Sequence, residues 1–141
     1  MELSPQVRGT AAKASEDIMD CKIELIFVPV TDVDRARDFY ANQVGFNLDH
    51  DIRVDENVRF VQLTPVGSAC SIAFGEGMGS ALAPGQQDSI QVVVASAQAA
   101  RDELIAKGVV ATELDVQPWG TFTSFADPDG NRWHVQELPA R

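Results

Sequence analysis

Residues 23–40 read IELIFVPVTDVDRARDFY, and residues 87–104 repeat the same pattern as QDSIQVVVASAQAARDEL. Each copy joins a β-branched run to a helix-forming run. A shift of 64 residues superimposes matching residues of the two copies, among them Val30 and Val94, Ala36 and Ala100, and Arg37-Asp38 and Arg101-Asp102. Internal repetition of this kind indicates that one supersecondary unit occurs twice. We therefore predict two similar halves that share a single core.

The order of strand and helix signals is the same in both halves. In the first half we predict strands at 22–30, 46–54, 58–65 and 69–74, with a helix from residue 33 to Gly45. In the second half we predict strands at 89–94, 113–117, 121–126 and 132–138, with a helix from residue 97 to Gly108. Thr31 and Ser96 stand where helix N-caps are expected. Each half is therefore predicted to be a βαβββ unit.

The domain boundaries follow from this order. At 141 residues the chain has the length of one domain with its own core. We predict a flexible N-terminal tail over 1–21 and a single domain over 22–138. Within that domain the repeats cover 22–75 and 88–138, and a glycine-rich linker at 76–87 joins them.

Charge and composition exclude several classes of partner. The formal net charge is −10, and the 11 basic residues are scattered among 21 acidic ones, so we predict no nucleic-acid partner. An anionic membrane surface is disfavoured for the same reason, and no apolar run reaches membrane-spanning length. Cys21 and Cys70 lack metal-type spacing, and we expect both to be reduced. Residues 1–20 show no apolar core of a signal peptide, so we expect a cytoplasmic protein.

With both repeats placed, the chain resembles the vicinal oxygen chelate superfamily of glyoxalases, bleomycin-resistance proteins and ring-cleaving dioxygenases. The matching segments are 28–32 (VPVTD), 36–40 (ARDFY), 44–46 (VGF) and 127–131 (DPDGN). The resemblance implies an α+β fold in which two βαβββ units form curved half-barrel sheets around a cavity, with helices outside. It also implies a homodimer, because the edge strands of each half-barrel need covering.

Metal ligands in the resembled superfamily come from the first and last strands of each unit. The corresponding positions here are Leu25, Ser71, Ser89 and His134. Leucine has no donor atom and a neutral serine hydroxyl is a poor ligand, whereas a catalytic metal site needs about three good ones. We therefore predict no bound metal and no other cofactor.

A second set of residues forms the predicted pocket. It combines aromatic walls with a few polar side chains, as is typical of small-molecule sites. Its members are Phe27, Phe60, Gln62, Ser71, Ser89, Gln91, Trp119, Phe122, His134 and Gln136. Strand alternation does not distinguish a pocket wall from a filled core. Trp119, between Pro118 and Gly120, either stacks on a planar ligand or packs over the end of the barrel.

Two polar positions allow more than one interpretation. His134 alternates with Trp133 and Val135, which places it on the pocket side as a polar contact, a proton-transfer group or a structural histidine. His50 lies between Asp49 and Asp51 in the second predicted strand. We expect His50 at the edge of the core beside a carboxylate, and we expect the two acids to share a solvated face.

These features favour a small-molecule-binding protein of the bleomycin-resistance type, which holds a small, largely apolar or aromatic molecule without metal. One alternative is a metal-independent isomerase, epimerase or lyase in which His134 is catalytic and transfers a proton. A second alternative is a metal-dependent lyase or dioxygenase of the same superfamily. Whether the protein turns over a substrate is left open by the sequence.

Overall fold

The computed structural model describes residues 19–140. Most of the predicted tail lies outside these residues, and Met19 to Cys21 are exposed without regular secondary structure. The first unit contains β1 (Leu25–Phe27), α1 (Val33–Asp38), η2 (Phe39–Val44), β2 (Asn47–Asp55), β3 (Val58–Thr64) and β4 (Ser71–Glu76). The second contains β5 (Ile90–Val94), α2 (Ala97–Ala106), β6 (Asp115–Gln117), β7 (Gly120–Ala126) and β8 (Arg132–Glu137).

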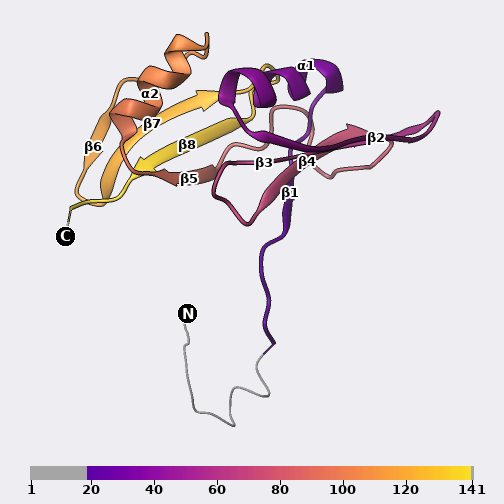
Figure 1. The fold of residues 1–141 in the computed structure, drawn as a ribbon, viewed down its shortest axis with the longest axis horizontal. Helices are drawn as coiled ribbons and strands as arrows, with labels where there is room; N and C mark the ends of the chain where they lie inside the picture. Colours follow the sequence, from indigo (N-terminus) through magenta and orange to yellow (C-terminus); the bar gives the residue numbers. More distant parts are fainter. Residues whose placement is uncertain (1–18, 141) are drawn as a thin grey trace.

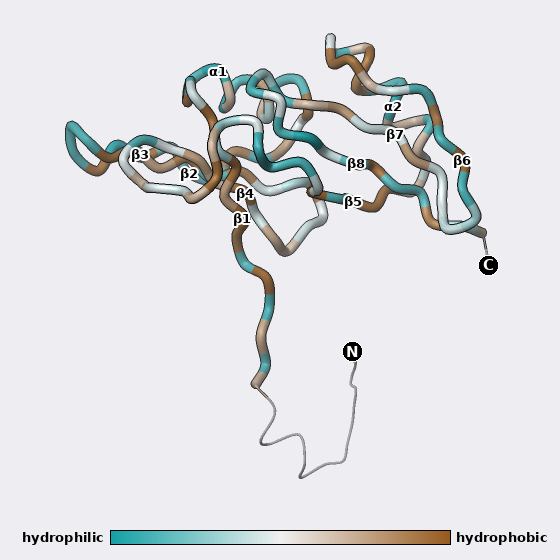
Figure 2. The backbone as a smooth tube through the Cα atoms, turned by 180° about the vertical axis from the view of Figure 1, so that it is seen from behind, coloured by the Kyte–Doolittle hydropathy of each residue, from teal (hydrophilic) through white to brown (hydrophobic). Residues whose placement is uncertain are grey.

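The two units have the same topology. Their sheets have the strand orders β1-β4-β3-β2 and β5-β8-β7-β6. In each sheet the first strand pairs in parallel with the last, and the other pairs are antiparallel. Figure 1 shows the sheets side by side with α1 and α2 on the same side of the molecule, and Figure 2 shows this arrangement from behind. The predicted α+β fold of two βαβββ units is confirmed.

Helix ends follow local side-chain chemistry. The predicted N-cap Ser96 is confirmed, because its hydroxyl accepts a hydrogen bond from Ala99 N at 3.0 Å. The predicted N-cap Thr31 is wrong: Asp32 caps α1, accepting from Arg35 N at 3.0 Å. The Thr31 hydroxyl donates instead to Asp129 Oδ1 at 2.7 Å. The Thr31 side chain, which the local pattern assigned to the helix cap, is therefore used in a contact with the second unit.

The first helix is not uniform, although the sequence predicted one continuous α-helix. It continues from α1 into the π-helical turn η2, and Gly45 ends it in the left-handed conformation with φ of +92°. Within η2, Phe39 and Tyr40 are buried. The wider turn thus carries two large aromatic side chains into the core between the units.

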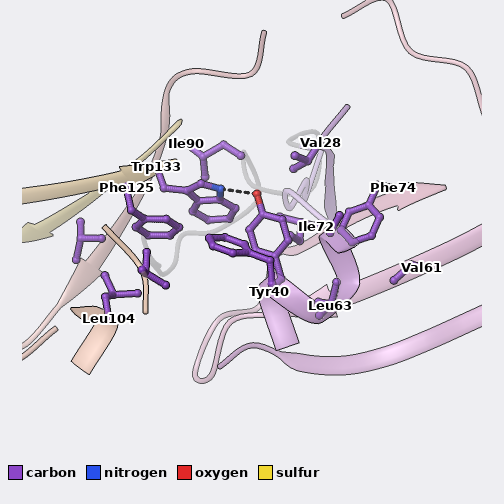
Figure 3. Packing of buried hydrophobic residues seen from close by; sticks show 14 of the residues in the cluster. Val28, Tyr40, Val61, Leu63, Ile72, Phe74, Ile90, Leu104, Phe125 and Trp133 are labelled. Atoms are coloured by element: carbon purple, nitrogen blue, oxygen red, sulfur yellow. Dashed lines mark hydrogen bonds between the residues drawn. The ribbon is translucent and has the colours of Figure 1, made fainter. Parts of the chain in front are cut away.

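The core lies between the helices and the sheets and runs through both units. Alternate residues of β3 and β4 face α1 and η2, and alternate residues of β7 and β8 face α2. Figure 3 shows Tyr40 of the first unit beside Trp133 of the second in the middle of this core. Its buried side chains include Val61, Leu63, Ile72, Phe74, Leu104, Phe125, Trp133 and Val135.

The predicted tight turn at 127–131 joins the units as well as the last two strands. Tyr40 Oη donates to Asp127 Oδ2 at 2.7 Å and accepts from Trp133 Nε1 at 2.9 Å. Asn131 Nδ2 donates to the carbonyl of Pro29 at 2.7 Å. Asp127 and Asn131 are buried, so these bonds are shielded from water. The two units therefore form one body through a polar cluster inside an apolar core.

None of the helices among residues 19–140 is long and apolar enough to cross a bilayer.

Candidate functional site: the helix-free faces of the two sheets

The strand pairing shows that the predicted pocket residues of the first sheet lie on one face of it. Phe27 and Gln62 both lie opposite Ala73, and Phe60 lies opposite Gly75. Ser71 is two residues before Ala73 and points to the same side. The alternating residues between them, such as Ile72 and Phe74, belong to the core under α1. We call the side of each sheet that is turned away from its helix the helix-free face.

The second sheet repeats this arrangement. Gln91 lies opposite His134, and Phe122 lies opposite Gln136. These four side chains occupy the helix-free face, because Trp133 and Val135 on the other side of β8 are buried in the core. Of the remaining predicted residues, Ser89 is exposed just before β5, and Trp119 is in the turn before β7.

Two pockets in the described part of the chain have other linings. The larger, about 460 Å³, lies where the two units meet and is lined by residues such as Val44, Phe46, Val66, Val92, Leu104 and Trp133. A smaller one of about 180 Å³ lies beside β1, and Phe27 is the predicted residue that lines it. Neither pocket combines the helix-free faces of both sheets. The strand register thus puts most of the predicted side chains on the helix-free faces, while their assembly into one cavity stays a prediction.

Both ring nitrogens of His134 have partners. Nε2 is 3.2 Å from the backbone carbonyl of Asp88, and Nδ1 is 2.9 Å from Ser124 Oγ. A carbonyl only accepts, so Nε2 carries the hydrogen and Nδ1 of the neutral ring accepts from the Ser124 hydroxyl. The lone pair of Nδ1 is thus engaged by the Ser124 hydroxyl, and a metal could bind there only in place of that hydrogen bond. This bonding is that of a structural or positioning histidine on the helix-free face.

A hydrogen-bonded pair of glutamines fixes the loop that carries Trp119. Gln91 Nε2 donates to Gln136 Oε1 at 2.8 Å, and Gln136 Nε2 donates to the Trp119 carbonyl at 3.0 Å. At Gly120, with φ of +150°, a Cβ would stand 2.8 Å from the Glu137 carbonyl and 2.9 Å from Gln136 Nε2. Glycine is required there. The backbone is therefore held while the Trp119 side chain stays 62% exposed at the rim of the sheet.

The residues at the superfamily's metal positions do not fit a divalent ion. Leu25 lies opposite Ser71 on neighbouring strands and supplies no donor atom. The Ser71 hydroxyl is hydrogen bonded to Thr64 at 2.6 Å, and His134 is engaged as described above. Residues 19–140 hold no group of three or more His, Cys, Asp or Glu side chains arranged for a metal. Metal-free binding remains a prediction that rests on the chemistry of these donors.

A β-bulge in β2 adds two polar residues that the sequence did not place on this face. The register shifts between Leu48 and His50, so Asp49 is an extra residue in the strand. Asp49 Oδ2 accepts from Thr64 Oγ1, and Oδ1 accepts from Asn47 Nδ2 at 2.8 Å. His50 is exposed opposite Gln62, not at the edge of the core. Asp49 and His50 therefore lie on the same helix-free face.

The bulge also separates the two acids that were expected to share a face. Asp51 lies opposite the buried Val61, on the helix side of the sheet. It accepts hydrogen bonds from Arg59 at 3.0 Å and Arg37 at 2.9 Å. These bonds, above all the one from Arg59, hold the pKa of Asp51 at about 2. The prediction of a shared solvated face is wrong, because an inserted residue changes the side-chain alternation and no sequence signal marks the insertion.

Comparison with known proteins identifies a family and several solved structures that this chain resembles. The family model of the Glyoxalase/Bleomycin resistance protein/Dioxygenase superfamily matches residues 22–135. The comparison with curated proteins gives no significant match. Among solved structures, TnmS3, an antibiotic binding protein from Streptomyces sp. CB03234, is 28% identical with a TM-score of 0.78, over 86% of this chain and 99% of that one.

Two further structures are similar over nearly their whole length. A glyoxalase/bleomycin resistance protein from Streptomyces sp. CB03234 is 30% identical, with a TM-score of 0.72 over 82% of this chain and 99% of that one. A member of the superfamily from Sphaerobacter thermophilus DSM 20745 is 31% identical, with a TM-score of 0.74 over 85% and 99%. The repeat, the topology and these matches lead to one conclusion: the chain belongs to the Glyoxalase/Bleomycin resistance protein/Dioxygenase superfamily.

Proposed function

We propose that this protein binds a small, largely apolar or aromatic molecule without metal, on the helix-free faces of its sheets. The observation that carries the proposal is the composition of these faces. Each combines aromatic side chains with hydrogen-bonded amides or hydroxyls, the usual make-up of a small-molecule site. Large apolar side chains there are open to solvent in the single chain: Phe27 is 40% exposed, Ile52 49% and Val93 59%. Apolar side chains that a sheet leaves open on the face without a helix are available for ligand or subunit contacts.

We further propose that two copies of the chain enclose the ligand. Within residues 19–140, β1 pairs only with β4 and β5 pairs only with β8, so each of these strands is an open edge of its sheet. Open edges invite pairing with another chain. A homodimer in which these edges are covered would set the helix-free face of one sheet against that of another copy. The cavity predicted from the sequence would then have walls from both copies.

The printed description of one relative supports the kind of ligand. TnmS3 is an antibiotic binding protein, and it matches nearly its full length to this chain. We propose an antibiotic-like aromatic compound as the ligand here. We also propose a cytoplasmic location, which the two free cysteines, Cys21 and Cys70, support.

The enzymatic alternatives have less support. Proton transfer by His134 would need a proton donor or acceptor of the substrate within reach, and its partners in the described residues are the Ser124 hydroxyl and the Asp88 backbone carbonyl, which does not titrate. Metal-dependent chemistry requires several good donors, and the corresponding positions hold leucine, two serines and this histidine. Binding without turnover requires neither.

A ligand screen with product analysis tests binding against catalysis. Purified protein is screened by thermal shift against planar aromatic natural-product-like compounds, and each hit is recovered and analysed. We expect the hits to be recovered unchanged. His134→Gln should bind them within about threefold of the wild type, since glutamine can still bond to Ser124 or the Asp88 carbonyl. A compound consumed by the wild type and untouched by the variant would establish the enzyme and overturn the binding-only proposal.

A matched pair of variants tests the location of the site. Phe60→Ala removes an aromatic wall of the helix-free face, and we expect it to weaken binding of a hit about tenfold. Val66→Asp puts a charge at the rim of the 460 Å³ pocket between the units, at a side chain 87% exposed, and should leave affinity within about twofold. If Val66→Asp weakened binding and Phe60→Ala did not, the ligand site would be the pocket between the units and not the helix-free face.

A further inference from the structure

A row of hydrogen-bonded side chains crosses the helix-free face of the first sheet. Gln62 Nε2 donates to Ser71 Oγ at 3.4 Å, Ser71 Oγ and Thr64 Oγ1 are 2.6 Å apart, and Thr64 Oγ1 donates to Asp49. The row thus runs from β4 and β3 to the bulge of β2. Its last member, Asp49, is half-buried and reachable from this face.

The direction of every bond in the row is fixed by the carboxylate. An ionised carboxylate only accepts, so Thr64 gives its one hydroxyl proton to Asp49. Ser71 must then donate to Thr64, and Gln62 donates to Ser71. All three side chains therefore point their donors along the row toward Asp49. Chains of this kind polarise one another and stabilise the charge at their end. In keeping with this, the Thr64 bond lowers the pKa of Asp49 below its usual value.

Among residues 19–140, no lysine or arginine pairs with this carboxylate. Asp51, on the opposite face of the same strand, is paired with Arg59 and Arg37, and Arg53 is paired with Glu76. In the described part of the chain, Asp49 forms no ion pair with lysine or arginine. Its hydrogen-bonding partners Asn47 and Thr64 are neutral, and His50 is the adjacent ionisable residue in the strand. A carboxylate offers about four acceptor positions, so capacity for another donor remains.

We propose that Asp49 is the polar anchor of the ligand site and that it binds a protonated amine carried by an aromatic ligand. This inference rests on the proposed function, since it places the ligand on the same face. Enclosing an ionised carboxylate without a cation is costly. A ligand ammonium supplies that cation, while the aromatic part of the ligand covers Phe60, Phe27 and Ile52. The bulge in β2 is what turns the carboxylate to this face.

Three anthracene probes of nearly equal shape test the inference: 9-(aminomethyl)anthracene, 9-anthracenemethanol and 9-anthracenecarboxylic acid. Their dissociation constants for the full chain at pH 7 are measured by fluorescence titration. We expect the ammonium probe to bind about tenfold more tightly than the alcohol, and the carboxylate probe to bind most weakly. Asp49→Asn should remove the preference for the ammonium and leave alcohol binding within about twofold.

Asp51→Asn is the matched control, because it removes the same charge two residues away on the opposite face. It should leave the ammonium preference intact at a pH and temperature where circular dichroism shows the variant folded. Should Asp49→Asn fail to fold, Asp49→Glu, which moves the carboxylate by one methylene, must lower the ammonium preference in its place.

The remaining outcomes separate the inference from the proposed function. If the wild type binds the ammonium and alcohol probes equally, or if Asp49→Asn keeps the preference, the anchor role is overturned while aromatic binding stands. An equal loss of all three probes in folded Asp49→Asn also overturns it and assigns Asp49 a purely structural role. If none of the probes binds the wild type, both the anchor and the proposed aromatic ligand are rejected.

Discussion

Tyr40 joins the two units both by the packing of its ring and by the hydrogen bonds of its hydroxyl. Its ring is fully buried, within 6.0 Å, centroid to centroid, of Phe39, Phe46, Phe74 and Trp133. Its hydroxyl bonds to Asp127 and Trp133 of the second unit. Burial, together with the charge of Asp127, raises the pKa of Tyr40, so the phenol stays protonated and remains a donor.

Tyr40→Phe isolates the contribution of that hydroxyl, because the ring and its packing are kept. The variant leaves the Trp133 indole N–H without its partner and removes one bond to a buried carboxylate. We expect the free energy of unfolding to fall by about 2–3 kcal/mol, measured by urea denaturation. Combining it with Asp127→Asn should give less than the sum of the two single losses, since both act on one bond. A loss below about 0.5 kcal/mol would mean that the hydroxyl is not shielded in solution.

At the scale of elements, a charged network fastens α1 to the first sheet. Asp51 of β2 accepts from Arg37 of α1 and Arg59 of β3, and Asp34 of α1 pairs with Arg59 at 2.8 Å. The helix is short, so these pairs add to the packing of Val33 and Ala36 in holding it. They lie on the helix side of the sheet, whereas Asp49, on the other side, accepts hydrogen bonds from the neutral side chains Thr64 and Asn47.

This network predicts how stability changes with pH. The pKa of Asp51 is lowered from 3.8 to about 2 in the folded chain, first by its bond from Arg59. A lowered pKa stabilises the fold above the unfolded value, and this stability is lost as pH falls through the folded value. We therefore expect the free energy of unfolding to decline as pH falls from about 4 to 2. In Asp51→Asn the decline over this window should be shallower, as measured by urea denaturation at each pH. Parallel curves for the two proteins would contradict the assignment.

The elements also show where local patterns suffice. Strand runs such as Val58–Thr64 and the second helix with its Ser96 cap were predicted correctly, because alternation and capping depend on neighbouring residues alone. The Asp32 cap, the π-helical turn η2 and the bulge at Asp49 were not predicted. Each of these features accompanies a contact between residues distant in sequence. Thr31 bonds to Asp129, Tyr40 bonds to Asp127 of the second unit, and Asp49 bonds to Thr64 of the neighbouring strand.

At the scale of the whole molecule, the proposed homodimer is the feature on which the cavity depends. The free edge of β5 and the 59% exposed Val93 on it are the surfaces that a second copy would cover. The helix-free faces of a single chain line no common pocket among the two described above.

Val93→Asp tests the homodimer directly. We expect sedimentation velocity at micromolar concentration to show a dimer for the wild type and a monomer for the variant, since an unpaired buried carboxylate opposes association. Val110→Asp is the control, because Val110 is 88% exposed and lies in the segment between α2 and β6, outside β1 and β5. It should remain dimeric. A monomeric wild type would refute the dimer and with it the two-copy cavity.

The sequence by itself determined the duplication, the α+β class, the order of strands and helices, and that His134 and Gln136 lie on the side of the last strand opposite Trp133 and Val135. These follow from periodicity and from a repeat that needs no knowledge of distant contacts. Only the tertiary structure decided that His134 bonds to Ser124 and the Asp88 carbonyl, that Tyr40 binds Asp127 and that Asp49 and Asp51 face opposite ways. Those facts depend on which residues distant in sequence meet, and on one inserted residue in a strand. Local patterns constrain a residue's face, whereas its bonding partners are set by the packing of the whole chain.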